Sequence, residues 1–141
     1  MITEDYVSFK TAKLLKKKGL DDEYTNAFYD KNGKLYFIEI LSDLSSHPNN
    51  DTDIAASTLY IAMKWLREVH GLCLFLIPAV VDEMLRPGYA IYPKCDNKWE
   101  WCASKNDGSK ATFGCDINKD YCDSYEQACE AAIKYCLEKL I

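Results

Sequence analysis

The chain has 141 residues, of which 48% are hydrophobic and 28% are charged, as expected for one soluble globular domain. Its 17 lysine and arginine residues are outnumbered by 22 aspartate and glutamate residues, which gives a formal net charge of −5. Because contacts to phosphate dominate nucleic-acid affinity, this acidic balance argues against general binding of nucleic acids or of anionic membranes.

The start of the chain, its hydropathy and its cysteines all indicate a cytoplasmic protein. Residues 1–5 are acidic and lack the basic and apolar segments of a secretory signal, so we expect no export. The longest apolar run, residues 72–81, is about half as long as a membrane-spanning helix. The seven cysteines include no C-x-x-C pair, which predicts reduced thiols rather than a zinc site or a redox motif.

The predicted elements start with a helix over Phe9–Lys18. Ser8 is a good N-cap, and Gly19 supplies a left-handed stop after which Leu20 can contact Leu15. Five lysines occupy the polar face and the last turn of this helix: Lys10, Lys13, Lys16, Lys17 and Lys18. We interpret them as a solvated face, with a phosphate-binding patch as the alternative.

A β-hairpin is predicted next, over residues 24–29 and 34–40. Both segments are rich in aromatic and branched side chains, and Asn32-Gly33 between them tolerates the positive φ angles of a type I′ turn. Residues 41–53 that follow are polar and rich in turn-forming residues, which predicts a loop. Loops on a rigid scaffold often carry binding residues, so this loop is a candidate contact region.

Hydrophobic periodicity predicts two further helices. The second begins after Ser57 or a near neighbour and ends at Gly71. The third spans residues 125–140, and Ser124 with Gln127 forms a capping box at its start. Three cysteines at seven-residue spacing belong to this region, and we interpret them as small buried apolar groups: Cys122, Cys129 and Cys136.

The remaining segments predict strands. Residues 72–77 are apolar without alternation, as in a central strand, and three shorter segments then indicate an antiparallel meander: residues 89–93, 98–104 and 110–115. The element order is therefore α-β-β-α-β-β-β-β-α. This order predicts a single α+β domain over residues 1–141, in which three helices pack mainly on one face of an antiparallel sheet made of the hairpin and the meander.

Two groups of side chains are candidate binding residues. Trp99 and Trp101 alternate onto one face of a predicted strand, where they form either a stacking platform for a ligand or the packing surface beneath a helix. His47 lies in the polar loop and is either a ligand or base, or an exposed bystander. His70 falls in the last turn of a helix, where the dipole favours a capping role. No cysteine or serine can be paired with a histidine from spacing, so we nominate no catalytic residue.

The segment before the third helix partly matches a calcium-binding EF-hand loop. The matching residues are Asp116, Asn118, Asp120, Ser124 and Gln127. Tyr121 stands where the loop needs glycine, and Gln127 stands where it needs a bidentate glutamate. The alternative is a polar connection from strand to helix, whose Asp and Asn side chains bond their own backbone.

Three helical stretches carry a resemblance to a known group of proteins. Residues 9–19 (FKTAKLLKKKG), 62–70 (AMKWLREVH) and 124–137 (SYEQACEAAIKYCL) resemble small uncharacterised proteins encoded by intestinal Bacteroidetes and by their phages or mobile elements. The family has no assigned activity, cofactor or catalytic residue, so no position here takes a role from it. The resemblance implies a cytoplasmic accessory protein of phage origin rather than a metabolic enzyme.

These observations predict a non-catalytic protein that binds another protein, through the exposed sheet face or the loop at residues 41–53. Ten tyrosines and three tryptophans exceed the needs of a core this size, and aromatic residues are favoured at interfaces. Two alternatives stay open. One is a small-molecule-binding protein or enzyme with a pocket near Trp99, Trp101 and His47, and the other is a calcium-binding module at residues 116–127. We expect no cofactor, because phosphate-binding and dinucleotide-binding glycine motifs are absent from the sequence.

Overall fold

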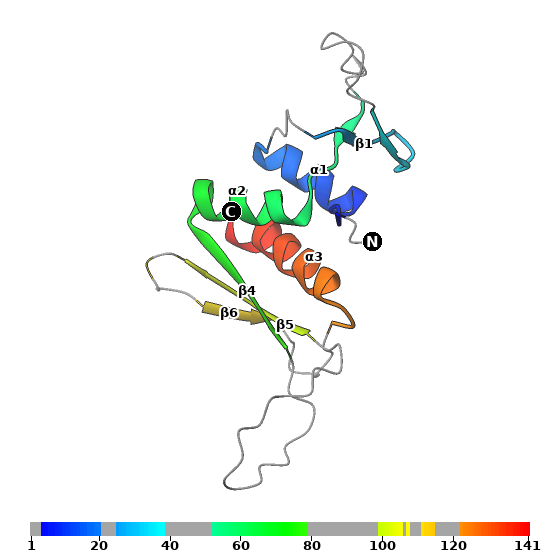
Figure 1. The fold of residues 1–141 in the computed structure, drawn as a ribbon. Coiled ribbons are helices and arrows are strands. Elements are labelled where there is room, and N and C mark those ends of the chain that lie inside the picture. The colour runs from blue at the N-terminus through cyan, green and yellow to red at the C-terminus, as the bar shows by residue number, and fades with distance from the viewer. Residues whose placement is uncertain are drawn as a thin grey trace, which may run out of the picture.

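The elements follow one another as helix, three strands, helix, three strands and helix (Figure 1). The structure is a computed structural model that describes residues 4–20, 25–38, 52–78, 99–105, 107, 111–114 and 122–141. The fold class is α+β, as the sequence predicts. Within the described ranges, no helix has both the length and the apolar character that crossing a membrane requires.

Helix α1 spans Phe9–Lys18, which are the residues that the sequence predicts. The Ser8 hydroxyl accepts a hydrogen bond from the backbone N–H of Thr11 and so caps the helix start. At the other end Gly19 adopts φ +101°, and the N–H of Leu20 donates to the carbonyl of Leu15 at 3.0 Å. This is the Schellman ending that a glycine in the left-handed region allows.

Helix α2 spans Leu59–His70 and is capped by Thr58, a neighbour of the expected Ser57. Helix α3 spans Tyr125–Tyr135 and continues as a π-helical turn, η1, over Cys136–Leu140. The prediction of one continuous α-helix to residue 140 is therefore right in extent and wrong in hydrogen-bond pattern over the last turn. Periodicity alone does not distinguish a terminal π-turn from an α-turn, because both keep the same residues helical.

The first sheet has the order β2-β1-β3, with β1 at Ala27–Tyr29, β2 at Leu35–Phe37 and β3 at Ile54–Ala55. The β1–β2 hairpin is confirmed, with Ala27 opposite Phe37. Its turn is longer than the expected two residues, since the N–H of Asp30 donates to the carbonyl of Lys34. Strand β3 was not predicted, because two residues are too few to show alternation.

The second sheet has the order β4-β5-β6, with β4 at Leu72–Pro78, β5 at Trp99–Lys105 and β6 at Ala111–Gly114. Both pairings are antiparallel, as in the predicted meander. The expected strand at residues 89–93 lies outside the described residues.

The expectation of one sheet with helices on one face is wrong for the described strands, which form two three-stranded sheets. The helices lie between them: α1 contacts β3 of the first sheet, while α2 and α3 contact the second sheet (Figure 1). The physical reason is that α2 leads the chain from β3 across the helical layer before β4 begins. The hairpin and the meander therefore cover different sides of the helices.

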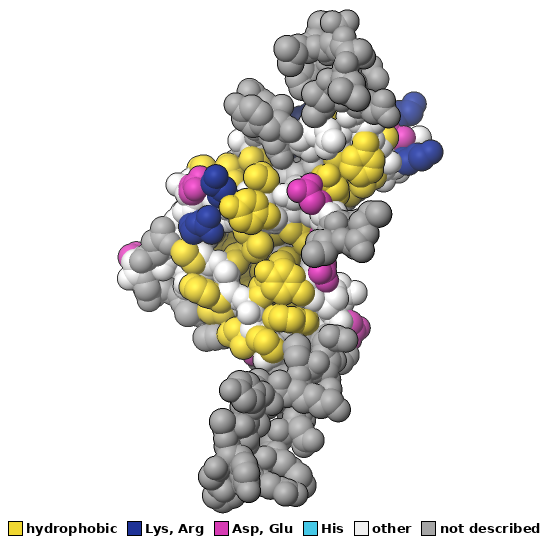
Figure 2. Space-filling model, in the orientation of Figure 1, with side chains coloured by type: hydrophobic (Ala, Val, Ile, Leu, Met, Phe, Trp, Pro, Cys, Tyr) yellow, Lys and Arg dark blue, Asp and Glu magenta, His cyan; other side chains and the backbone are white. Residues whose placement is uncertain are grey.

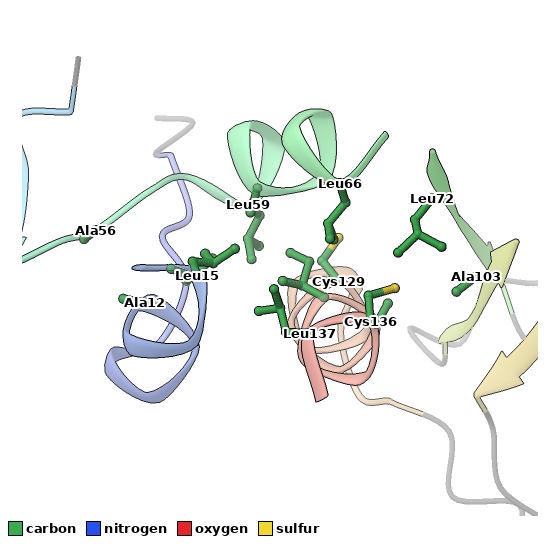
Figure 3. Packing of buried hydrophobic residues seen from close by; sticks show 14 of the residues in the cluster. Ala12, Leu15, Ala56, Leu59, Leu66, Leu72, Ala103, Cys129, Cys136 and Leu137 are labelled. Atoms are coloured by element: carbon green, nitrogen blue, oxygen red, sulfur yellow. The ribbon is translucent and has the colours of Figure 1, made fainter. Parts of the chain in front are cut away.

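The main core forms where the three helices meet the second sheet (Figure 3). Leu15 of α1, Leu66 of α2 and Leu137 of η1 point toward one another, and Leu72 closes the cluster from β4. Cys129 and Cys136 are fully buried in the same cluster, as the sequence predicts, whereas Cys122, which precedes α3, is only half-buried. Burial raises the pKa of the Cys136 thiol to about 12, so this sulfur is a neutral packing group.

Candidate functional site

Most of the candidate ligand residues from the sequence lie outside the described part of the chain. These are His47, Asp116, Asn118 and Asp120, so the roles suggested for them stay predictions. Gln127 is described and takes part in the capping box. Its backbone N–H donates to Ser124 Oγ at 3.1 Å, and its side-chain Oε1 accepts from the N–H of Asp123, also at 3.1 Å. Two amides at the start of α3 are thereby satisfied, as expected.

Trp99 and Trp101 both pack beneath α3. Trp101 is only 7% exposed, and its ring centroid lies 5.0 Å from that of Tyr135. Trp99 meets Tyr125 edge-on at 5.1 Å, and it exchanges two backbone hydrogen bonds with Cys122 just before the helix. These contacts are the packing arrangement that the sequence also allows. A binding role for either indole stays a prediction.

His70 ends α2 with its ring against Trp65 rather than in an open site. The two ring centroids are 4.5 Å apart with the planes nearly perpendicular. Its Nε2 is buried, and no hydrogen-bond partner for it is found among the described residues. Neither of the two cavities considered below is lined by this histidine.

A groove of about 530 Å³ lies where the segment before α1 meets the first turns of α2 and α3. We call it the tyrosine groove, and its walls include Glu4, Asp5, Tyr6, Tyr60, Tyr125 and Glu126. Backbone pairing fixes the N-terminal wall, because the N–H of Val7 donates to Ser57 and the N–H of Leu59 donates to Asp5. This pairing and the Thr58 cap together set the direction in which α2 starts beside the groove.

Three tyrosines line the groove: Tyr6, Tyr60 and Tyr125. Tyr60 is 64% exposed and Tyr125 is 42% exposed, which is unusual for side chains of this size. Tyr6 packs edge-on against Phe37 with ring centroids 5.6 Å apart, so its orientation is fixed from behind. Figure 2 shows that hydrophobic side chains also gather across this face of the molecule, over α2 and α3. Among the described residues, the groove is therefore an exposed aromatic surface.

The electrostatic character of the tyrosine groove is negative. Glu4, Asp5 and Glu126 are exposed carboxylates on its walls, and no lysine, arginine or histidine is present among the described lining residues. Burial and the nearby charge of Glu4 raise the pKa of Tyr6. Burial, Cys129 and the charge of Glu126 raise the pKa of Tyr125. Both phenols are therefore neutral at physiological pH, and the carboxylates supply the charge.

A second, shallower cavity of about 400 Å³ continues the groove along α3. It shares Asp5, Tyr6 and Glu126 with the first cavity and adds Glu130 and Lys134. Lys134 Nζ lies 4.0 Å from a carboxylate oxygen of Glu138, one turn further along the helix, so its charge is partnered within the helix surface. The extension leaves the negative character of the groove in place.

Glu130 fastens α3 to the start of α1 beside this second cavity. Its Oε1 accepts hydrogen bonds from the Ser8 N–H at 3.1 Å, from Thr11 Oγ1 at 2.5 Å and from Ser8 Oγ. The bonds join residues more than a hundred positions apart in the chain, and sequence reasoning missed them. The only signal was a glutamate on the predicted third helix, which is ordinary on a solvated face.

The chemistry available in the tyrosine groove is suited to binding. Its described lining offers carboxylates, phenols and two threonine hydroxyls, but neither a thiol nor an imidazole. A nucleophile with an adjacent base is therefore not formed by these residues. Aromatic faces beside carboxylates instead match a ligand that carries both apolar surface and positive charge.

Comparisons of this chain with protein-family models, with curated proteins and with solved structures return no match. The function is therefore argued from the groove and its residues.

Proposed function

We propose that the protein is a non-catalytic binding module that holds a segment of another protein in the tyrosine groove. The observation that carries this proposal is the pair of exposed rings, Tyr60 of α2 and Tyr125 of α3, which line one groove. Tyrosine supplies a large contact area at a low cost in conformational entropy, and it is enriched at the centres of protein interfaces.

The size of the groove supports a segment rather than a whole globular surface as the occupant. A volume of about 530 Å³ falls within the range of sites that enclose a ligand of a few side chains. Ile61 and Met63 of α2 are half-buried and add apolar surface to the lining of the groove. A peptide segment can bury its side chains there while its backbone remains at the open side.

The tyrosine groove is favoured over the exposed sheet face that the sequence suggested. Phe75 and Ile77 are 54% and 41% exposed on β4, and they alternate away from the side that packs on the helices. They offer apolar area, but the two cavities described above lie elsewhere. The groove combines apolar area with concave shape and charge, which are the features that give an interface its specificity.

Selection from a library of random twelve-residue peptides displayed on phage tests the proposal. We expect the immobilised wild-type protein to enrich one family of related peptides, and a Tyr60→Ala/Tyr125→Ala variant to lose them. Val69→Ala is the matched control, because Val69 is an exposed apolar residue on α2 that does not line the groove. Failure to enrich any family, or enrichment of peptides that bind the double variant equally well, overturns the proposal.

We also propose that the protein acts in the cytoplasm as an accessory protein of a phage or mobile element. The buried cysteines Cys102, Cys129 and Cys136 are free thiols, and free buried thiols are typical of proteins from a reducing compartment. The resemblance of the three helical stretches to proteins of intestinal Bacteroidetes and their mobile elements supports a role in a phage or mobile element. Sequencing the genes beside this one in its host tests it: phage or transposition genes are expected, and a conserved metabolic operon contradicts it.

A further inference from the structure

Three carboxylates on the walls of the tyrosine groove carry negative charge that no described cation neutralises. Glu4 lies 3.4 Å from the Tyr6 hydroxyl, and no cation among the described residues forms an ion pair with Glu4, Asp5 or Glu126. By contrast, Glu130 is engaged by three hydrogen bonds from α1, and Glu138 has Lys134 beside it. Glu4, Asp5 and Glu126 thus line the groove without a cationic partner among the described residues.

These carboxylates act on the same place from different elements. Asp5 comes from the segment before α1, while Glu126 comes from the first turn of α3. Burial raises the pKa of Cys129 to about 11, and the charges of Glu126 and Asp5 both add to this increase. Asp5 and Glu126 are like charges on the walls of one groove, and a cationic ligand bound there relieves their repulsion.

The tyrosines of the groove favour a planar cation, because a planar group can stack on an aromatic ring. A guanidinium group is planar, stacks on a tyrosine face and can donate two parallel hydrogen bonds to one carboxylate. Tyr6, Tyr60 and Tyr125 line the same groove as Asp5 and Glu126. An ammonium group lacks the planar surface for stacking, and a neutral side chain lacks the charge.

We infer that the segment bound in the tyrosine groove presents an arginine side chain, which stacks on Tyr60 and Tyr125 and pairs with Asp5 and Glu126. This inference rests on the proposed function and names the chemistry of the partner. The net charge of −5 favours the same encounter at longer range, because it attracts basic segments and repels acidic ones.

A titration of the ¹⁵N-labelled protein with N-acetyl-arginine amide tests the inference, followed by amide chemical shifts. N-acetyl-citrulline amide is the matched probe, since it has the same shape and carries no charge. We expect arginine to shift the amides of residues 4–6, 58–63 and 125–126 and to bind about tenfold more tightly than citrulline. In 1 M NaCl, where the Debye length is about 3 Å, this preference should shrink.

Point variants test whether arginine binds at the groove carboxylates and at Tyr60. Asp5→Asn/Glu126→Gln should weaken arginine binding about fivefold, because it removes the paired charges while keeping the side-chain shapes. Glu68→Gln is the control, since this exposed carboxylate lies on α2 beside Lys64 and does not line the groove. Tyr60→Phe should retain binding and Tyr60→Ala should lose it, because the ring face supplies the contact.

Equal binding of arginine and citrulline, or an unchanged affinity in the double carboxylate variant, overturns the inference. If library peptides without arginine still require Tyr60 and Tyr125, the proposed function stands and only the choice of arginine is wrong. If neither library peptides nor the arginine probe bind the groove, both proposals are wrong.

Discussion

Replacing Glu130 with alanine is the sharpest test of how the helices are held together. Glu130 Oε1 accepts three hydrogen bonds from Ser8 and Thr11 at the start of α1. Thr11 is fully buried in the wild-type protein, so its hydroxyl depends on protein groups for its hydrogen bonds. It can still accept from Ser8 Oγ at 3.2 Å, but its own proton is left without a partner.

The expected cost follows from these bonds. A hydrogen bond to a charged group contributes about 1.5 to 3 kcal/mol, and the Ser8 bonds count for less because Ser8 is exposed. We therefore expect Glu130→Ala to lower the free energy of unfolding by about 2 to 3 kcal/mol. Glu130→Gln keeps an acceptor oxygen without the charge and should cost about 1 kcal/mol.

Urea unfolding followed by circular dichroism measures the effect. With a slope of about 2 kcal/mol per molar urea, the midpoint of Glu130→Ala should fall by about 1 M or more. Glu68→Ala is the control, because Glu68 is an exposed helix residue whose ion pair with Lys64 is 4.0 Å long and contributes at most about 0.5 kcal/mol. If Glu130→Ala and Glu68→Ala have the same midpoint, the reasoning about the buried hydroxyl is refuted.

Two further predictions concern two glycines with positive φ and two buried thiols. Gly19→Ala should lower the free energy of unfolding by about 1 to 2 kcal/mol, because Gly19 has a positive φ. Gly33→Ala should lower it further, since an added Cβ meets Phe9 Cδ1 at 2.8 Å. Equal urea midpoints for the two variants contradict this prediction. Burial raises the pKa values of two thiols to about 11 and about 12, against about 8.5 for a free thiol, so above pH 8.5 the unfolded chain binds fewer protons than the folded one. As the pH rises above 8.5, the free energy of unfolding should fall by up to about 1.4 kcal/mol per pH unit for each thiol, until the pH reaches the folded pKa of that thiol. A Cys129→Ala/Cys136→Ala variant should show a smaller slope. If the wild type and the variant have parallel slopes, this prediction is wrong.

The helix boundaries could be predicted from the sequence because they depend on local hydrogen bonds. Ser8 caps α1 through Thr11, three residues away, and Gly19 ends the helix through contacts within one turn. The burial of Cys129 and Cys136 also follows from helical spacing within one element. In each case, the atoms that decide the structure lie within a few positions of one another.

The division into two sheets and the tyrosine groove could not be predicted in this way. Strand β3 is only two residues long, yet it pairs with β1 and completes the first sheet. The chain then runs through α2 before β4 begins the second sheet. Tyr6, Tyr60 and Tyr125 come from three distant parts of the chain, and no spacing relates them. The surplus of aromatic residues indicated a binding protein, but only the packing of α2 and α3 against the N-terminal segment shows which rings stay uncovered.

Photocrosslinking tests the central claim that the tyrosine groove is the binding surface. A peptide obtained from the library selection, with benzophenylalanine substituted at one position at a time, is irradiated with the wild-type protein, and the crosslinked residues are located by mass spectrometry. We predict crosslinks within residues 4–6, 59–63 and 125–126, which line the groove. Crosslinks concentrated on Phe75 and Ile77 of β4 contradict the claim and place binding on the outer face of the second sheet.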